Sequence, residues 1–159
     1  MIIRKAKITD FLKISKLDRD AWGENAHANF VPDGEHVWRL WVEYAIVYCV
    51  EKEENIIGVI LAFPTNNINE YFLHKIFIDY QFRKQKIGYK LFQQLCHDLD
   101  KKKLNCSLTT APENEAMKKL CKIFSFNDVC FVNSYYRKEE DRLFYTRKFI
   151  TKQSSQYIT

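Results

Sequence analysis

A short basic turn, Arg83-Lys84-Gln85-Lys86-Ile87-Gly88, separates an apolar stretch from a helix-like run with regularly spaced leucines. A helix that begins directly after a strand presents unpaired N–H groups and the positive end of its dipole. A phosphate group placed there meets hydrogen-bond donors and favourable charge together. Gly88 is one of only four glycines in the chain and would let the backbone come close to such a ligand. The turn therefore predicts an anion site, and the alternative is an ordinary solvated turn.

Two side chains upstream of this turn could move a proton. His74 lies in "LHKIFIDYQFR", nine residues before Arg83. An imidazole titrates at roughly pH 6.5 and suits a general base at neutral pH. Glu70 has the same alternation parity as His74, so both side chains could line one cleft. The alternatives are a hydrogen-bonded structural histidine and a solvated glutamate at the strand edge.

The cysteines do not predict a disulfide framework or a metal site. There is no CxxC pair, the number is odd, and the four histidines show no HxxxH spacing, so we expect no metal and a reducing compartment. Cys121 lies on an apolar helical stripe, which is typical of a small core residue. Its alternative role is that of a weak general acid, because a thiol can return a proton to a thiolate of similar basicity. Tyr135, Tyr136 and Tyr145 are further candidates for that acid, and the sequence does not choose between them.

The elements that must position these groups follow the order β-α-α-β-β-β-α-β-α-β-β. The central strand–turn–helix–strand predicts one βαβ crossover in a mostly antiparallel sheet. Asp33 is the predicted N-cap of the second helix, in which Val37, Leu40, Trp41 and Tyr44 share a stripe, so Trp41 is expected in the core. The predicted strands are 2–6, 45–50, 56–63, 70–78, 105–110 and two near the C-terminus, in "DVCFVNSYY" and "RLFYTRKFI".

Length and composition limit the class of protein. The chain has 159 residues, of which 47% are hydrophobic, so one domain over 1–150 with a polar tail over 151–159 is expected. The net charge of +5 fits an anionic ligand but is too small to argue for nucleic acid. No run approaches 18 apolar residues and the N-terminus does not read as a signal peptide, so we expect a cytoplasmic protein without a membrane contact.

Two short motifs resemble those of the Gcn5-related N-acetyltransferase (GNAT) superfamily. The first has the pattern Arg/Gln-x-x-Gly-x-Gly/Ala, which is similar to residues 83–88. The second is Asn-x-x-Ala-x-x-Leu-Tyr followed by Gly-Phe. The segment "NEAMKKLCKIFSF" places six residues in register with it: Asn114, Met117, Leu120, Cys121, Ser125 and Phe126. The element order is similar as well, so the resemblance covers about residues 2 to 149.

The resemblance implies that acetyl-CoA is the co-substrate. Amides of the 84–89 turn would hold the pyrophosphate, and the backbone of the fourth strand would run beside the pantetheine arm. The residues implied in cofactor binding are Phe77, Ile78, Arg83, Lys84, Gln85, Lys86, Ile87, Gly88, Tyr89 and Asn114. Two positions depart from the pattern. Lys86 replaces a glycine, and Cys121 stands where many members have a tyrosine that protonates the departing thiolate.

The resemblance also implies the fold and the reaction. The fold would be a single α/β domain with a mixed, mostly antiparallel sheet of about seven strands, splayed between strands four and five. The reaction would be acetyl transfer to a primary amine of a small molecule or peptide, by direct attack in a ternary complex. His74 resembles the histidine of the arylalkylamine branch, and Glu70 resembles a glutamate of histone-acetylating relatives.

The segment that would line the acceptor pocket is rich in tryptophan. Trp22 and Trp38, together with Tyr135, are the predicted acceptor contacts. Glu24, Asp33 and Glu35 could attract a cationic amine, or could be surface and capping residues. The competing functions are a catalytically weak acyl-CoA-binding regulatory module and, from the basic balance alone, a nucleic-acid-binding module. A homodimer through the last strands is common among the relatives that the resemblance suggests.

Overall fold

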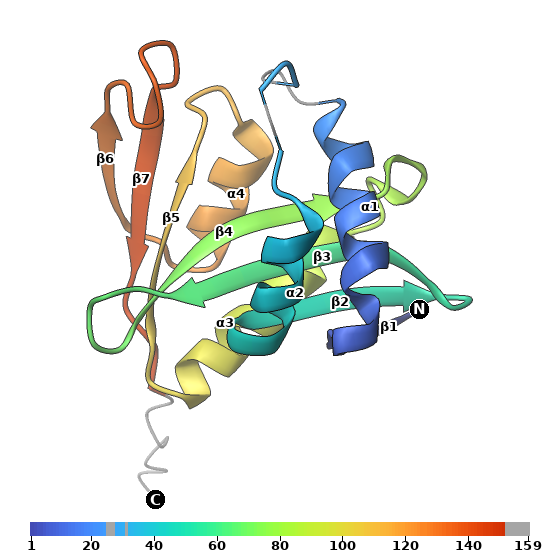
Figure 1. Ribbon diagram of the computed structural model, residues 1–159. Helices are drawn as coiled ribbons and strands as arrows, with labels where there is room; N and C mark the ends of the chain where they lie inside the picture. The colour runs from blue at the N-terminus through green and yellow to red at the C-terminus, as the bar shows by residue number, and fades with distance from the viewer. Residues whose placement is uncertain (25–27, 31, 152–159) are drawn as a thin grey trace, which may run out of the picture.

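The computed structural model describes residues 1–24, 28–30 and 32–151, so nearly all of the predicted tail 151–159 lies outside the described residues. Within these ranges seven strands form one sheet in the order β1-β2-β3-β4-β5-β7-β6 (Figure 1). Only β4 and β5 are parallel neighbours, which confirms a mixed, mostly antiparallel sheet. The strands are β1 (Ile2–Lys5), β2 (Ile46–Lys52), β3 (Asn55–Pro64), β4 (Glu70–Ile78), β5 (Asn105–Thr110), β6 (Asp128–Val132) and β7 (Arg142–Arg147).

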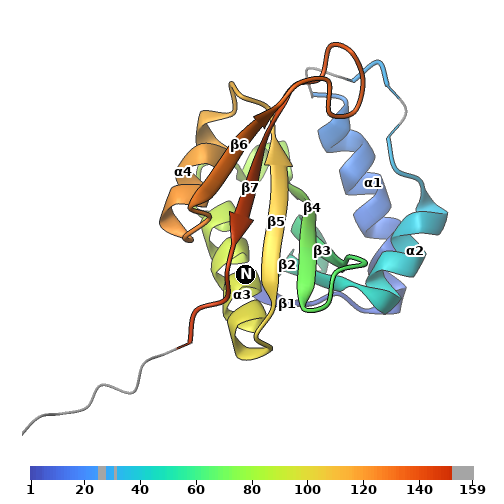
Figure 2. The same cartoon turned by 90° about the vertical axis from the view of Figure 1, so that its left-hand side faces the viewer.

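Helices cover both faces of the sheet. The helices are α1 (Phe11–Trp22), α2 (Glu35–Tyr44), α3 (Ile87–Lys101) and α4 (Glu115–Ile123), with short 3₁₀ turns at Ile8–Asp10 and Tyr80–Phe82. In Figure 2 the sheet is seen between α3 and α4 on one side and α1 and α2 on the other. Each face therefore buries its own apolar cluster. One is centred on Leu91, Leu95 and Leu99 of α3, and the other on Trp38.

The sheet opens between β4 and β5, as the resemblance implied. Pairing between the two strands runs from Glu70–Asn105 to Leu73–Leu108 and then stops. Beyond Leu73, β4 continues to Ile78 with pairing only to β3, while β5 continues to Thr110 with pairing only to β7. The last five residues of β4 therefore have one strand edge that no strand of the described chain covers.

A β-bulge interrupts β4 at the opening. Leu61 of β3 faces Lys75, and the next residue, Ala62, faces Leu73, so His74 is an extra residue without an opposite partner. Such a bulge breaks the alternation of side chains along a strand. As a result His74 and Lys75, although adjacent in sequence, both contact Asp33 on the α1/α2 face.

The buried side of α2 differs from the predicted stripe. Trp38 is completely buried, whereas Leu40 is 53% exposed and Tyr44 is 71% exposed. The Trp38 ring packs edge-on against Trp41 at 5.0 Å and Phe77 at 5.7 Å between centroids. The helix turns the large indole of Trp38 towards the sheet instead of Leu40 and Tyr44, because burying more apolar area stabilises the fold more. The predicted N-cap is also wrong, because Gly34 precedes the helix and Asp33 does not cap it.

Candidate active site

The uncovered edge of β4 offers backbone groups to a ligand. Asp79 N donates to Ile57 O at 2.9 Å, and hydrogen-bonded pairs alternate along antiparallel strands. The peptide groups of Phe77 therefore point towards β3, where it faces Val59, and those of Ile76 and Ile78 point into the opening. Two residues were predicted to run beside a pantetheine arm. The peptide groups of Ile78 face the opening, and those of Phe77 do not. Ile76, which was not among the predicted residues, faces the opening as well, and strand register of this kind cannot be read from the sequence.

The basic turn lies at the end of this strand edge. Lys84 and Lys86 both have left-handed backbone conformations, with φ of 63° and 59°. Lys86 is the N-cap of α3, and its carbonyl accepts from Lys90 N at 3.1 Å. The position where the superfamily motif has glycine thus has the conformation that glycine adopts at no steric cost. All side chains from Arg83 to Lys86 are exposed, so their charges surround the unpaired N–H groups of the helix start.

Gly88 faces the sheet and has an ordinary helical backbone conformation. A Cβ atom there would lie 3.4 Å from Ile78 Cδ1 and 3.9 Å from Ile76 Cδ1. The missing side chain therefore lets the first turn of α3 approach β4 closely. This differs from the predicted reason for the glycine, which was close approach of the backbone to a phosphate. The effect is to bring the helix N-terminus next to the open edge of β4.

Arg83 connects the turn to the end of α1. Its guanidinium lies 2.8 Å from a carboxylate oxygen of Glu24, donates through Nε to Ile78 O at 3.4 Å, and lies 5.5 Å from the centre of the Tyr80 ring. Glu24 is thereby paired, which changes its predicted role of attracting a cationic amine. A shallow pocket of about 130 Å³ lies beside this contact, between α1 and Tyr80.

His74 makes a hydrogen bond with Asp33. Its Nε2 lies 3.2 Å from Asp33 Oδ2, and its ring lies against Trp41 at 5.2 Å and Phe63 at 5.7 Å. Burial alone would raise the pKa of Asp33, but hydrogen bonds from His74 and Lys75 outweigh it and lower this pKa to about 2. An ionised carboxylate only accepts hydrogen bonds, so the neutral ring holds its proton on Nε2. The lone pair on Nδ1 is then available to accept a proton.

Lys75 lies on the other side of Asp33 and extends the network into the core. Its Nζ is 2.7 Å from Asp33 Oδ2 and 2.6 Å from Asp18 Oδ2. Trp38 Nε1 donates to the same Asp18 carboxylate at 2.9 Å, and the Trp22 ring lies 5.4 Å from the Lys75 ammonium. The network His74–Asp33–Lys75–Asp18–Trp38 was not predicted. It depends on the bulge in β4, which left no signal in the spacing of apolar residues.

The low pKa of Asp33 predicts a particular dependence of stability on pH. A carboxyl group whose pKa falls on folding stabilises the native state above its unfolded pKa, near 3.9, and loses this contribution as pH falls towards 2. We expect Asp33→Asn to lower the free energy of unfolding by roughly 1–2 kcal/mol at pH 7. The difference from the parent should narrow between pH 4 and pH 2. Urea unfolding at pH 7, 4 and 2.5 measures this, and a difference that stays constant with pH would contradict it.

Glu70 lies at the paired end of β4, away from the opening. Its carboxylate accepts from Ser107 Oγ at 3.1 Å and from Asn67 Nδ2 at 2.6 Å. It is four residues before His74, and the bulge lies between them. The structure therefore does not bring the two predicted bases together, and Glu70 is bound to its own neighbours.

Cys121 is completely buried in the cluster beneath α3. Burial raises the pKa of its thiol to about 12. A thiol that is inaccessible and so weakly acidic is a poor proton donor to a departing thiolate, so the general-acid assignment for Cys121 is not supported. Tyr145 packs against the same cluster, and burial followed by the nearby Cys121 raises the pKa of its phenol.

Asn114 is the N-cap of α4, and its Oδ1 accepts from Met117 N at 3.0 Å. This explains the residue type at the start of the second motif in physical terms, because asparagine satisfies an unpaired N–H of the helix. Its side chain is exposed, and Nδ2 is the group that would remain for a pantetheine arm. Tyr89, in the first turn of α3, is 39% exposed, and its ring lies 5.1 Å from that of Phe124.

The predicted acceptor contacts divide into three environments. Trp38 belongs to the core, because its side chain is completely buried and cannot contact an acceptor. Trp22 is half-buried and donates from Nε1 to Phe30 O at 2.9 Å, which holds part of the segment between α1 and α2. Tyr135 lies in the β6–β7 loop with 36% of its surface exposed, 6.4 Å from the Phe144 ring. Glu35 is paired with Arg19 at 3.3 Å.

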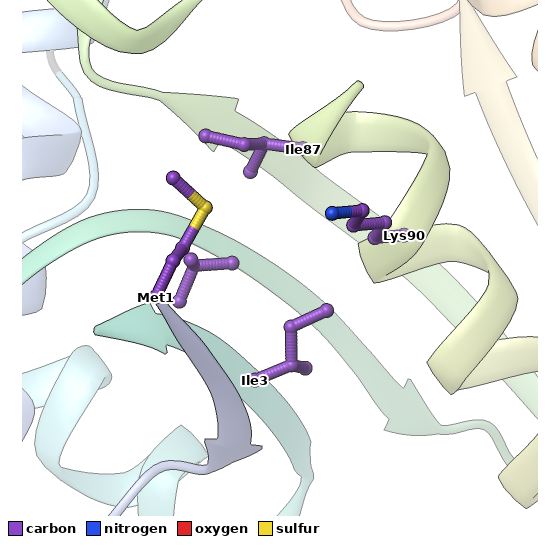
Figure 3. A pocket seen from close by; sticks show the side chains of 5 residues that line it. Met1, Ile3, Ile87 and Lys90 are labelled. Atoms are coloured by element: carbon purple, nitrogen blue, oxygen red, sulfur yellow. The ribbon is translucent and has the colours of Figure 1, made fainter. Parts of the chain in front are cut away.

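A second pocket lies on the opposite face, beside the start of α3. Its volume is about 90 Å³, and Figure 3 shows Met1, Ile3, Ile87 and Lys90 around it. Sites that enclose a small-molecule ligand measure several hundred cubic ångströms, on the order of 300–1,000 Å³. This pocket is therefore too small to hold a nucleotide.

Neither a metal site nor a membrane contact was predicted from the sequence, and the structure describes residues 1–24, 28–30 and 32–151. In these ranges no group of histidine, cysteine and acidic side chains has the arrangement to hold a metal ion. The same part of the chain contains no helix with the length and hydropathy needed to cross a membrane.

Comparison with known proteins agrees with this architecture. The sequence model of the acetyltransferase (GNAT) family matches residues 11–126. None of the curated protein sequences compared with the chain matches it. The ribosomal-protein-S18-alanine N-acetyltransferase from Escherichia coli is similar in structure, with a TM-score of 0.79 and 19% identity over 98% of both chains. For the ribosomal-protein-alanine N-acetyltransferase from Brucella melitensis the TM-score is 0.80 and the identity 18%, over 94% of this chain and 100% of that one.

A third similar structure contains coenzyme A. It is an aminoglycoside 6'-N-acetyltransferase complexed with coenzyme A, with a TM-score of 0.74 and 14% identity over 96% of this chain and 99% of that one. At these identities the three structures show a common fold alone. The family match over residues 11–126 is a separate finding, which comes from the sequence.

Proposed function

The chain belongs to the acetyltransferase (GNAT) family, and from this we propose that it transfers an acetyl group from acetyl-CoA to a primary amine by direct attack in a ternary complex. The observation that carries the proposal is the uncovered edge of β4. There the peptide groups of Ile76 and Ile78 face the opening, next to the N-terminus of α3. That edge can hydrogen-bond an extended pantetheine chain, and the helix start can bind a diphosphate.

In this proposal the turn and the strand edge hold the thioester while His74 removes the proton. The neutral amine attacks the thioester carbonyl carbon, a C–N bond forms, the C–S bond breaks, and CoA leaves as the thiolate. The proton released from the amine passes to Nδ1 of His74, directly or through one water molecule. Asp33 stabilises the resulting imidazolium, because its carboxylate is already bonded to Nε2. Fixed positions of the reactants supply much of the rate.

The thiolate is a fair leaving group, so the proposal does not require a buried acid. Tyr145 packs against the cluster that contains Cys121, the position where the motif often has a tyrosine, and is a candidate acid should one be needed. Five free cysteines suit a reducing compartment. We propose that the reaction takes place in the cytoplasm.

Two measurements test the proposed function. Calorimetry with acetyl-CoA should show binding, and release of free thiol in the presence of a panel of primary amines should show turnover. Binding without turnover would favour the competing function, a catalytically weak acyl-CoA-binding module, for which the burial of Cys121 is the specific observation. Absence of acetyl-CoA binding would refute both.

Lys86 allows a prediction about the charge of the turn. If its ammonium pairs with the diphosphate, removing it should cost on the order of 1 kcal/mol at an exposed site, and less at high salt. We expect Lys86→Ala to weaken acetyl-CoA binding severalfold. Lys86→Gly should lie between alanine and the parent, because glycine adopts the left-handed φ of 59° without strain.

Dissociation constants of the three proteins at low and at physiological salt measure this effect. The differences between them should shrink as ionic strength rises. Equal affinities of lysine and alanine at low salt would mean that Lys86 is only a solvated side chain, while the backbone cradle could still operate.

A further inference from the structure

A single oxygen atom connects the candidate base to the core of the protein. Oδ2 of Asp33 lies 3.2 Å from His74 Nε2 and 2.7 Å from Lys75 Nζ, so an imidazole and an ammonium share one acceptor. Asp33 lies in the segment before α2, where neither a helix nor a strand fixes its position. The orientation of its carboxylate therefore depends on its contacts with these two side chains of β4.

Lys75 is the better anchored of the two. An ammonium has three N–H donors, and three carboxylate oxygens lie within 2.9 Å of Lys75 Nζ, namely Oδ2 of Asp33 and both oxygens of Asp18. The Asp18 side chain is 4% exposed, and Trp38 Nε1 donates to it at 2.9 Å. The fixed part of the network is thus the Asp18–Lys75 pair, which ties β4 to α1 and α2. Asp33 and the ring of His74 are held from this pair.

The charges of the network are not balanced while His74 is neutral. The carboxylates of Asp18 and Asp33 face the single ammonium of Lys75, so one negative charge is in excess. A proton on His74 removes the excess, because the imidazolium places a positive charge directly beside Asp33. Acetyl transfer creates this imidazolium when the ring takes the proton of the amine. The network is therefore complementary to the ring in its protonated state.

The other elements packed against His74 contact it through uncharged rings. α2 contributes Trp41 and β3 contributes Phe63, with centroids 5.2 and 5.7 Å from that of the imidazole. β3 contains no charged residue. The charged side chains of α2 and the acid of β4 have other partners or are exposed: Arg39 with Glu43, Glu35 with Arg19, Glu70 with Ser107 and Asn67, and His36. Asp33 and Lys75 are the charged groups that act on the ring most directly.

We infer that Lys75 is a positioning residue for the proposed base. Its ammonium holds Asp33 against Nε2 of His74, which fixes the ring and leaves Nδ1 for the amine. Its charge also offsets one of the two carboxylates, so the ring is neutral before the transfer and stabilised when it becomes charged. Lys75 does not contact the reactants. The inference rests on the proposed function and adds to it a residue that acts through Asp33.

The titration of the His74 ring tests the charge balance without any acetyl transfer. NMR of the imidazole between pH 4 and pH 9 follows its proton, and the absence of a signal in His74→Ala identifies it. Lys75→Met removes a nearby positive charge and should move the midpoint of this titration to higher pH by about half a pH unit or more. Asp33→Asn removes the adjacent negative charge and should move the midpoint in the opposite direction by a similar amount.

The double variant Lys75→Met with Asp18→Asn separates charge from position. It removes one charge of each sign, so its titration midpoint should lie between those of Lys75→Met and the parent. It also takes away the ammonium that holds Asp33, so the ring should still be poorly oriented. Should Lys75→Met not fold, the double variant carries both measurements.

Kinetics measure the loss of position. Thiol release from acetyl-CoA is followed with propylamine and with spermidine as acceptors, each at the pH of maximal activity. We expect kcat of the double variant to fall about tenfold, because a misplaced base is less effective, while the dissociation constant for acetyl-CoA stays within twofold. Lys75→Arg keeps the positive charge and should retain more of kcat than the double variant, with a titration midpoint close to that of the parent.

Lys16→Met is the control, because it removes an exposed lysine of α1 that pairs with Asp20. It should change neither the titration nor kcat. The inference is overturned if Lys75→Met and Asp33→Asn move the midpoint in the same direction or leave it in place, or if the double variant keeps parental kcat. If the midpoints move as expected but no amine releases thiol, the proposed reaction fails and takes the role in transfer with it. The action of Lys75 on the ring through Asp33 would in that case be confirmed.

Discussion

Replacing His74 with alanine should lower kcat/KM for the acceptor amine by about 100-fold or more at neutral pH. The amine is mostly protonated near pH 7, with a pKa of roughly 10, and must lose a proton to attack. His74 lies at the opening of the sheet and bonds through Nε2 to Asp33, and in the part of the chain that the structure describes no hydrogen bond engages Nδ1. The dissociation constant for acetyl-CoA should change less than twofold, since the β4 backbone and the 83–88 turn stay in place.

His36→Ala is the matched control for this experiment. His36 is an exposed histidine in the first turn of α2 and contributes nothing to the proposed site. Its variant should keep parental kcat/KM. The dependence of kcat/KM on pH gives a second measurement, because loss of a base removes the corresponding limb of the profile. A rate for His74→Ala within twofold of the parent would make it a structural histidine and transfer the role to a water chain or to Glu70.

Local patterns in the sequence were sufficient to predict the elements and their order. Short apolar runs marked the strands, and the basic turn marked the start of α3, which begins at Ile87. The splay between β4 and β5 followed from resemblance rather than from spacing, and the register confirms it. These features depend on neighbours close in the chain or on a topology shared by a family.

The details of the candidate site depend on distant contacts and were predicted less well. Asp33 was expected to cap a helix, yet its carboxylate binds two side chains of β4 that lie 41 and 42 residues away in the chain (74 − 33 and 75 − 33). The buried face of α2 was predicted wrongly because two faces that include Trp41 are apolar, one with Leu40 and one with Trp38. Packing of Trp38 on Phe77 selects the second face, and this contact cannot be read from the sequence. The bulge at His74 has no composition signal at all.

The bulge explains why one short segment can supply both chemistry and rigidity. A regular strand would put His74 and Lys75 on opposite faces. With the bulge, His74 lies against Trp41 and Phe63, while Lys75 holds the carboxylates of Asp33 and Asp18. The position of the candidate base therefore depends on the part-buried ammonium of Lys75, which takes no part in the transfer.

Replacing Lys75 with methionine should lower the free energy of unfolding by about 3 kcal/mol or more. The Lys75 side chain is 13% exposed and that of Asp18 is 4% exposed, so Asp18 would be left as a buried carboxylate without its main partner. Trp38 Nε1 would still donate to Asp18, which offsets only part of the desolvation. Methionine fills similar volume, so the loss should come from charge rather than from a cavity. Urea unfolding at pH 7 measures it.

A second variant tests whether the unpaired charge is the cause. Lys75→Met combined with Asp18→Asn removes both charges, while the asparagine oxygen can still accept from Trp38. The double variant should recover more than half of the stability lost in Lys75→Met, which gives a favourable coupling energy between the two positions. Lys16→Met is the control, because the Lys16–Asp20 pair lies on the exposed face of α1 and should be worth less than about 0.5 kcal/mol. If Lys75→Met is within 1 kcal/mol of the parent, or if the double variant is less stable than the single one, the network does not support β4 in the way inferred. His74 would then owe its position to the packing of Trp41 and Phe63 alone.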